Sequence, residues 1–209
     1  MNKTNATGIE PAAKKSEQTV EWVQQAQAGN TTAFHRLVDR FQPEIYRMIY
    51  YRTRSQMDAE DLTQDVFLRA YKHIKRVESP NVFRSWLYRI AVNRVRDHYR
   101  RQRIKSLVGM VSVDEETFQE TEEMAITPQA EDNLTRHDFW KQVQQMMEQL
   151  SKMEREVFLL RFFDQLSIKE MAATLKKNEN TIKTHLYRAL NKVKAAAEAD
   201  HAQSLWEAL

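Results

Sequence analysis

Residues 83–105 read FRSWLYRIAVNRVRDHYRRQRIK, and this stretch decides which fold and which chemistry we expect. It carries seven Arg and one Lys against a single Asp, with four aromatic rings between them: Phe83, Trp86, Tyr88 and Tyr99. At the helical repeat, the apolar residues fall on one side: Phe83, Leu87, Ile90, Ala91 and Val95. The other side carries a polar stripe, which consists of Arg89, Asn93, Arg96 and Arg100. The pattern predicts a helix that packs on one side and presents cations on the other.

The scarcity of acids in this helix favours a bound anion over an ordinary solvated face, which usually interleaves both signs. Phosphates would account for the arginines, and aromatic faces stack on unpaired bases with about 1–3 kcal/mol per base. We therefore expect opened DNA as the ligand. A solvated amphipathic helix remains an alternative, and so does a membrane surface, although the apolar side is needed for a domain core.

The rest of the chain is also helical in pattern. The 209 residues include only three Gly and four Pro and have a hydrophobic fraction of 42%, which leaves few turn residues for a sheet. We expect a first helix to end at Gly29, a new helix to begin at Pro43, and Ser79 to cap a helix with Pro80 in its first position.

The second half begins with an acidic stretch without a helical stripe. Residues 114–132 contain eight Asp or Glu and no Lys or Arg, so residues 106–127 are predicted to be a linker. Thr127 and Pro128 are expected to start a helix, and two capping boxes follow, Ser151 with Glu154 and Ser167 with Glu170. The chain is thus predicted to be all-α, with two helical domains joined by a flexible acidic linker.

Residues 166–194, LSIKEMAATLKKNENTIKTHLYRALNKVK, have the layout of a helix-turn-helix. Apolar positions lie on one face of each helix, and the second helix points polar residues outward: Lys183, Thr184, Tyr187, Arg188 and Asn191. Such a set suits phosphates and base edges in a major groove. Two packed helices with a polar surface would be the alternative.

Composition limits the other classes of function. There is no Cys, and the six His are scattered without ligand spacing, so we expect no metal and no cofactor. No apolar run approaches the roughly 20 residues of a membrane span, which favours a cytoplasmic protein without membrane insertion.

Four segments together resemble the extracytoplasmic-function (group four) sigma factors of the sigma-70 family, over about residues 20–194. They are AGNTTAFHRLVDRF (28–41), DAEDLTQDVFLRAY (58–71), FRSWLYRIAVNRVRDHYRR (83–101) and TIKTHLYRAL (181–190). The resemblance implies a non-enzymatic factor that binds core RNA polymerase and opens promoter DNA. It implies a tail at 1–16, region two at 17–105, the linker at 106–127, region four at 128–198 and a tail at 199–209.

The resemblance also implies roles for individual residues. The helix at 58–71 would dock on the clamp helices of the largest polymerase subunit, through Asp58, Glu60, Asp61, Asp65 and Arg69. The minus-ten element would be captured and melted by Ser79, Asn81, Trp86, Arg89, Asn93, Arg96 and Arg100. The minus-thirty-five element would be read by Lys183, Thr184, His185, Tyr187 and Arg188. Region four would also meet the polymerase flap, the linker would thread the polymerase cleft, and an anti-sigma factor is expected as a further partner.

The sequence departs from the family at the helix-turn-helix and at the loop. Lys176 stands near a position where glycine is common, so either a non-glycine residue is left-handed or the turn differs. His185 stands where arginine is frequent, and the loop VESPN (77–81) is unusual. The promoter sequence is therefore not carried over.

Three other functions fit parts of the chain. A response-regulator transcription factor shares the pattern of residues 150–175 but needs a phosphoacceptor domain before it, which the chain does not offer ahead of Asp132. A metal-dependent nuclease could use Asp58, Asp61 and Asp65 on one helical face. The chain could also bind DNA alone, and residues 200–209 could be a small docking helix or a frayed tail.

Overall fold

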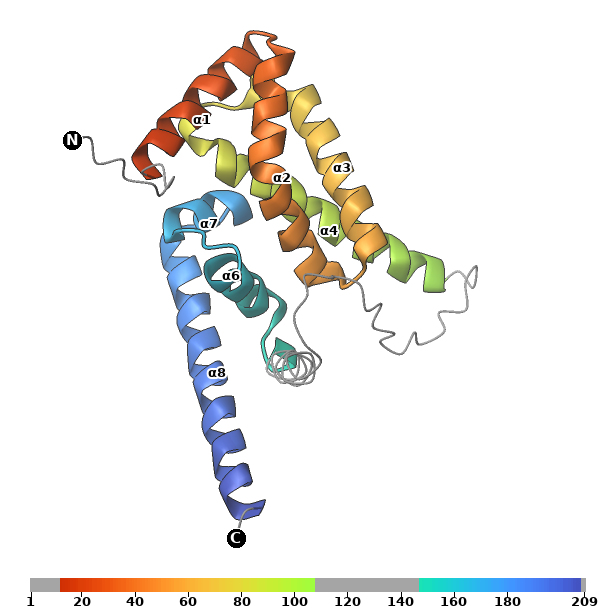
Figure 1. Cartoon of the computed structure of the whole chain (residues 1–209). Helices are drawn as coiled ribbons and strands as arrows, with labels where there is room; N and C mark the ends of the chain where they lie inside the picture. Colours follow the sequence, from red (N-terminus) through yellow and green to blue (C-terminus); the bar gives the residue numbers. More distant parts are fainter. Residues whose placement is uncertain (1–11, 108–146, 208–209) are drawn as a thin grey trace, which may run out of the picture. The chain divides into compact units, whose positions relative to one another are not determined.

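The computed structural model describes residues 12–107 and 147–207. Their regular elements are helices: α1 (Ala12–Gln27), α2 (Thr31–Thr53), α3 (Gln56–His73), α4 (Phe83–Leu107), α6 (Lys152–Phe162), α7 (Ile168–Leu175) and α8 (Glu179–Glu207). Two 3-10 turns, η1 (Ile74–Arg76) and η2 (Pro80–Val82), connect α3 to α4. The first compact unit consists mainly of α1 to α4, and the second mainly of α6 to α8 (Figure 1). This confirms the all-α fold with two helical domains. α4 continues through Leu107, two residues into the predicted linker, while residues 108–127 of that linker and the expected helix start at Thr127 lie outside the described residues.

The first unit is built around α2, which packs against both α1 and α3. Its core contains side chains from all four helices with no exposed surface, among them Val23, Leu37, Ile45, Ile49, Val66 and Leu87. Burial of such aliphatic side chains contributes about 1.5–3 kcal/mol each. This core fixes the directions in which the opposite faces of α3 and α4 point.

α2 runs without a break through Pro43, so the expectation that a new helix begins there is wrong. Phe41 and Ile45 on either side of the proline are both buried, which holds the two halves of α2 on one core. Pro43 itself is exposed, and water can therefore hydrate the carbonyl group of Asp39 that loses its helical partner. The burial of Phe41 and Ile45 on one face of α2 outweighs the hydrogen bond that Pro43 removes on the exposed face.

The connection between α1 and α2 follows the expected turn chemistry. Gly29 has φ of +99°, the left-handed conformation that ends a helix, and this confirms its role after α1. The side chain of Asn30 then accepts a hydrogen bond from the Ala33 N–H at 3.1 Å and caps α2. At its other end α1 begins at Ala12, within the stretch expected to be a tail.

The second unit is organised by α6 packing on α8. Met147, Leu150, Phe158 and Ala189 form its buried cluster. Both capping boxes are confirmed: the Ser151 N–H donates to Glu154 Oε2 at 2.9 Å, and the Ser167 N–H donates to Glu170 Oε2 at 2.8 Å. α8 continues to Glu207, so residues 199–207 extend this helix instead of forming a separate docking helix.

No helix in the described parts of the chain is both long and apolar enough to cross a membrane.

Candidate nucleic-acid interface

The outer face of α4 carries the polar stripe that the sequence predicts. Asn93, Arg96 and Arg100 are exposed and Arg89 is partly exposed. The opposite face packs into the first unit, and its buried side chains include Phe83, Leu87, Tyr88, Ala91, Val92 and Val95. Because the buried side fixes the helix, the cations and the amide of the stripe follow one another along a rigid element.

The four aromatic rings of α4 do not share one role. Phe83 and Tyr88 have 1% and 0% of their surface exposed, so they belong to the core and cannot stack on bases. Trp86 is half-buried, with its ring centroid 5.8 Å from that of Phe83. Tyr99 is 45% exposed, and its hydroxyl donates to the Arg52 carbonyl oxygen. The expectation that the rings as a set serve unpaired bases is therefore wrong for two of them: Phe83 lies on the apolar side of the helix and Tyr88 at its border, and both pack into the core.

One arginine of the basic run is structural. Arg94 is 7% exposed; its Nε lies 2.5 Å from Asp65 Oδ2 of α3, and its Nη1 lies 3.3 Å from Asp97 Oδ2. The guanidinium group thus joins α3 to α4 within the first unit. The charge count of the sequence could not separate Arg94 from its exposed neighbours, because its partner lies on another helix.

The acids that were expected to meet the polymerase fall into two groups. Asp65 pairs with Arg94 and also with Arg69, whose Nε lies 3.2 Å away, and Asp58 Oδ2 lies 3.7 Å from His98 Nε2. Glu60 and Asp61 are instead exposed. Among the described residues, no group of three or more Asp, Glu, His or Cys side chains is arranged to hold a metal ion.

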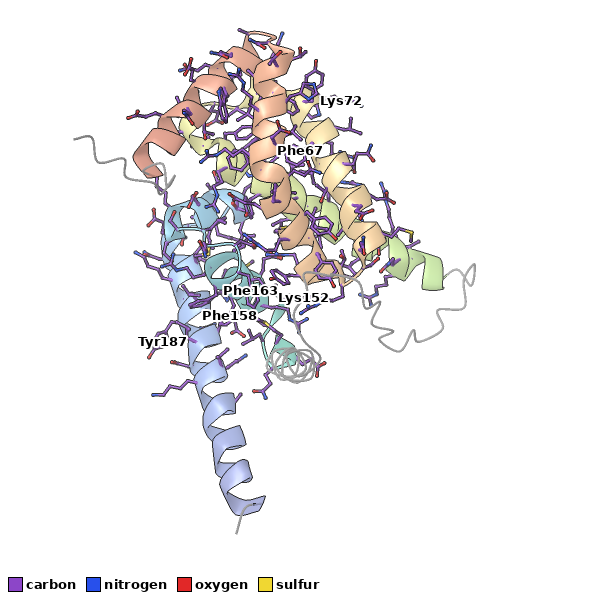
Figure 2. The ribbon with its side chains drawn as sticks, viewed as in Figure 1. Phe67, Lys72, Lys152, Phe158, Phe163 and Tyr187 are labelled. Carbon is purple, nitrogen blue, oxygen red and sulfur yellow. The ribbon has the colours of Figure 1, made fainter. Side chains whose placement is uncertain are left out.

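An apolar groove of about 580 Å³ lies between α2 and α3, and Glu60 is among the residues that line it. Phe34, Val38 and Tyr46 line it from α2, and Phe67, Leu68 and Tyr71 line it from α3. Figure 2 shows Phe67 between these two helices and Lys72 at the surface of α3. Burial, together with nearby Glu60, raises the pKa of the Tyr46 hydroxyl, so this phenol stays neutral at the groove's polar edge.

The loop from η1 to α4 presents the remaining candidates for minus-ten recognition. Pro80 occupies the first position of η2, as expected, but the Ser79 side chain makes no capping hydrogen bond there. Asn81 is exposed and Val82 is 41% exposed, whereas Val77 at the start of the loop is buried. The loop therefore offers an exposed tip on a buried base.

In the second unit, α7, a short turn and α8 form the expected helix-turn-helix. Lys176 in the turn has φ of +53°, so the left-handed position is filled by a lysine where glycine would be unstrained. The Asn178 side chain accepts from the Thr181 N–H at 2.7 Å and caps α8. Of the two alternatives that the sequence left open, the left-handed non-glycine residue is the one observed.

The outer face of α8 holds most of the expected base-reading residues. Lys183, Thr184, Tyr187 and Arg188 are exposed, and Figure 2 shows Tyr187 projecting from α8 on the side away from α6. The Thr184 hydroxyl donates to the Asn180 carbonyl oxygen at 2.9 Å. His185 differs, because it is half-buried and its Nδ1 is buried without a hydrogen-bond partner.

Comparison with known families agrees with this division. Residues 37–104 match the family described as Sigma-70 region 2, and residues 140–193 match the one described as Sigma-70, region 4. The first match runs from Leu37 within α2 to Ile104 near the end of α4, and α1 lies outside it.

The chain is similar to curated proteins over most of its length. It is 35% identical to the ECF RNA polymerase sigma factor BldN of Streptomyces coelicolor, over 86% of this chain and 66% of BldN, slightly less than two thirds of that relative. It is 29% identical to SigW of Bacillus subtilis, over 79% of this chain and 89% of SigW. It is 27% identical to the sigma-E factor of Escherichia coli, over 80% and 87%.

Two solved structures share the fold. CnrH, in complex with the cytosolic domain of CnrY, aligns with a TM-score of 0.63 and 25% identity over 88% of this chain and 99% of that chain. The sigma factor RpoE of Bartonella quintana, in complex with the anti-sigma factor NepR, aligns with a TM-score of 0.59 and 24% identity over 80% and 98%.

Proposed function

The chain belongs to the extracytoplasmic-function sigma factors of the sigma-70 family, and we propose that it directs core RNA polymerase to specific promoters and helps to melt their minus-ten element. The observation that carries this proposal is the fixed outer face of α4, where Asn93, Arg96 and Arg100 are exposed along the helix that follows the exposed loop tip at Asn81. Guanidinium groups bind phosphates without regard to sequence, while a nearby loop can hold individual bases. The first unit thus suits a separated strand.

The proposed minus-ten surface includes fewer of the aromatic side chains of α4 than the sequence alone suggests. Trp86 is half-buried, so only part of its ring is accessible for stacking. Unstacking a base costs a few kcal/mol, and contacts from Asn81, Ser79, Trp86 and the stripe of α4 would offset that cost.

The second unit would read the minus-thirty-five element through the outer face of α8. Lys183 and Arg188 are exposed there and suit phosphates or guanine edges, while Tyr187 and the Thr184 methyl group offer apolar contact. His185 would contribute from the edge of this surface, since it is half-buried.

The polymerase-binding surface would combine charge with apolar area. Glu60 and Asp61 are exposed, and Glu60 lines the groove between α2 and α3. Asp65 instead pairs with arginines of the first unit, and Asp58 lies near His98. Acids at the rim guide encounter with a basic partner, and the apolar groove supplies the buried area of a stable contact. Asp65 and Arg69 would then act mainly by holding the shape of α3.

We assign no catalytic role to the chain, because RNA synthesis would be carried out by the polymerase that it positions. It would act with that polymerase in the cytoplasm. An anti-sigma factor is a further proposed partner. Support comes from the similar solved structures of CnrH with the cytosolic domain of CnrY and of RpoE with the anti-sigma factor NepR.

In-vitro transcription tests the proposal. Purified chain and core polymerase should produce discrete transcripts from a library of genomic fragments, and core polymerase alone should not. Weak promoter binding by the free chain is expected beside strong binding by the holoenzyme. Tight, specific binding by the isolated chain would favour a DNA-binding protein that acts alone, and DNA cleavage on addition of Mg²⁺ or Mn²⁺ would favour a nuclease.

A further inference from the structure

The loop that connects α3 to α4 is held by a side chain from α1, a helix outside the residues that match either sigma-70 family. The Gln27 amide nitrogen, Nε2, donates to the Val77 carbonyl oxygen at 2.9 Å and to the Ile74 carbonyl oxygen at 3.3 Å. An amide carries two hydrogens on this nitrogen, so it can serve both acceptors. Val77 directly precedes the exposed part of the loop, and the two bonds therefore fix where the loop leaves η1.

Gln27 has little freedom of its own. It lies in the last turn of α1, which Val23 and Ala26 anchor with 0% and 6% of their surface exposed. The turn is closed by two hydrogen bonds, from the Gly29 N–H to the Ala26 carbonyl and from the Asn30 N–H to the Gln25 carbonyl, each 3.0 Å long. The left-handed φ of Gly29 lets the chain reverse immediately afterwards.

The far end of the loop is fixed by the first unit as well. The Val82 N–H donates to the Ser79 carbonyl at 3.0 Å, and the Ser85 hydroxyl donates to the Val82 carbonyl at 2.9 Å. Phe83, which follows, is 1% exposed. The loop is thus clamped at both ends, and α1 provides the clamp at the η1 end while it also packs against η1 and η2.

We infer that Gln27 is a positioning residue for recognition of the minus-ten element. The inference rests on the proposed function, in which the loop tip holds bases of a separated strand. Gln27 would not touch the bases itself. It would act only through its hydrogen bonds to the carbonyl oxygens of Ile74 and Val77. A site that recognises a base is sensitive to small displacements, since an error of about 1 Å can cost about a hundredfold in rate.

Three substitutions separate the hydrogen bonds from other effects. Gln27→Met keeps the length but removes both donors, Gln27→Glu also places negative charge against two carbonyl oxygens, and Gln27→Lys restores a donor on a longer chain. Gln24→Glu is the matched control, because Gln24 is an exposed residue of the same helix.

Two measurements on the whole chain test whether Gln27 positions the loop for minus-ten recognition. In the first, holoenzymes select promoters from a fragment library in which the minus-ten and minus-thirty-five elements are randomised, and both base preferences are read by sequencing the transcripts. In the second, hydrogen exchange follows the amides of residues 77–83 in the free chain. Thermal unfolding identifies any variant that fails to fold.

We expect Gln27→Met and Gln27→Glu to weaken minus-ten discrimination by about tenfold to a hundredfold. The minus-thirty-five preference should be unchanged, exchange at residues 77–83 should be faster, and Gln27→Lys should recover most of the discrimination. An unchanged minus-ten preference would overturn the inference, and so would an equal loss at both elements. If the wild-type chain gave no specific transcripts with core polymerase, the proposed function would fail, and exchange at residues 77–83 would still show whether Gln27 holds the loop.

Discussion

Lys192 Nζ of α8 lies 2.7 Å from Glu154 Oε2 of α6, and this pair joins the two longest described helices of the second unit. The Glu154 side chain is 7% exposed and also accepts a hydrogen bond from the Ser151 N–H at the start of α6. The hydrogen bond from Lys192, followed by that from the Ser151 backbone, lowers the pKa of the Glu154 carboxyl from 4.5 to about 2. One carboxylate thus caps α6 and fixes α8 against it.

Because the pKa of Glu154 is lowered, the stability of the second unit should depend on pH in the acidic range. A carboxyl group with a depressed folded-state pKa stabilises the fold above its unfolded pKa, and this stabilisation is lost as the pH falls through the folded value. For Glu154 the loss should occur between about pH 4.5 and about pH 2. Glu154→Gln should therefore lower the free energy of unfolding at pH 7 by about 1–2 kcal/mol, since Lys192 is partly solvated.

Urea unfolding of the full chain, followed by circular dichroism from pH 7 to pH 2, measures this dependence. Lys192→Met should weaken the pH dependence in the same range. Equal pH dependence in wild type and Glu154→Gln would show that other carboxyl groups govern acid unfolding.

The turn of the helix-turn-helix should gain stability from a glycine. Lys176 adopts φ of +53°, which costs an L-residue roughly 1 kcal/mol relative to glycine. Lys176→Gly is expected to stabilise the fold by about that amount, whereas Lys177→Gly, one residue later and without a positive φ, should destabilise it slightly. Differential scanning calorimetry of both variants checks the sign, and a lower melting temperature for Lys176→Gly would contradict the account of the turn.

Two neighbouring arginines of α4 should behave differently. Arg94→Ala removes the ion pairs with Asp65 and Asp97 and should lower the free energy of unfolding by about 1–3 kcal/mol. Arg96→Ala should change stability by less than about 0.5 kcal/mol, because this side chain is exposed. It should instead lower the salt slope of holoenzyme binding to open promoter DNA by about one unit.

Chemical denaturation and binding titrations over a range of salt concentrations separate the two effects. A stability loss at Arg96 equal to that at Arg94, or an unchanged salt slope, would place Arg96 outside the DNA-binding surface.

Reversing one charge on α3 tests the proposed polymerase surface. Asp61 is exposed on α3 and follows Glu60, which lines the apolar groove. Asp61→Lys should weaken binding to core polymerase by about tenfold or more, since like charges across an interface cost several kcal/mol. Glu17→Lys on α1 makes the same charge change at an exposed site and is the control. Fluorescence anisotropy of labelled chain titrated with core polymerase provides the measurement, and equal effects of both variants would exclude α3 as the docking face.

Helical spacing in the sequence predicted the stripe of α4, both capping boxes and the helix-turn-helix, because these features depend on residues three or four positions apart. It failed at Pro43, where tertiary burial of Phe41 and Ile45 overrides a local helix breaker. It also could not tell that Tyr88 lies in the core, since its position on the helix is near the border of the apolar side.

Features that depend on distant partners left no signal. Arg94 differs from Arg96 in its ion pair with Asp65, which lies on another helix. Gln27 meets backbone carbonyls 47 and 50 residues away, and backbone acceptors have no signature in a single sequence. The roles of both residues follow only from the packing of the helices against one another within the first unit.

The central claim is that the exposed face of α4 grips promoter strands after they separate. Transcription by the holoenzyme from a promoter recovered in the library selection, on duplex templates and on templates with a pre-melted minus-ten element, tests it most directly. We predict that Arg96→Ala combined with Arg100→Ala reduces synthesis on both templates. Transcription from the pre-melted template at the wild-type level would contradict the claim.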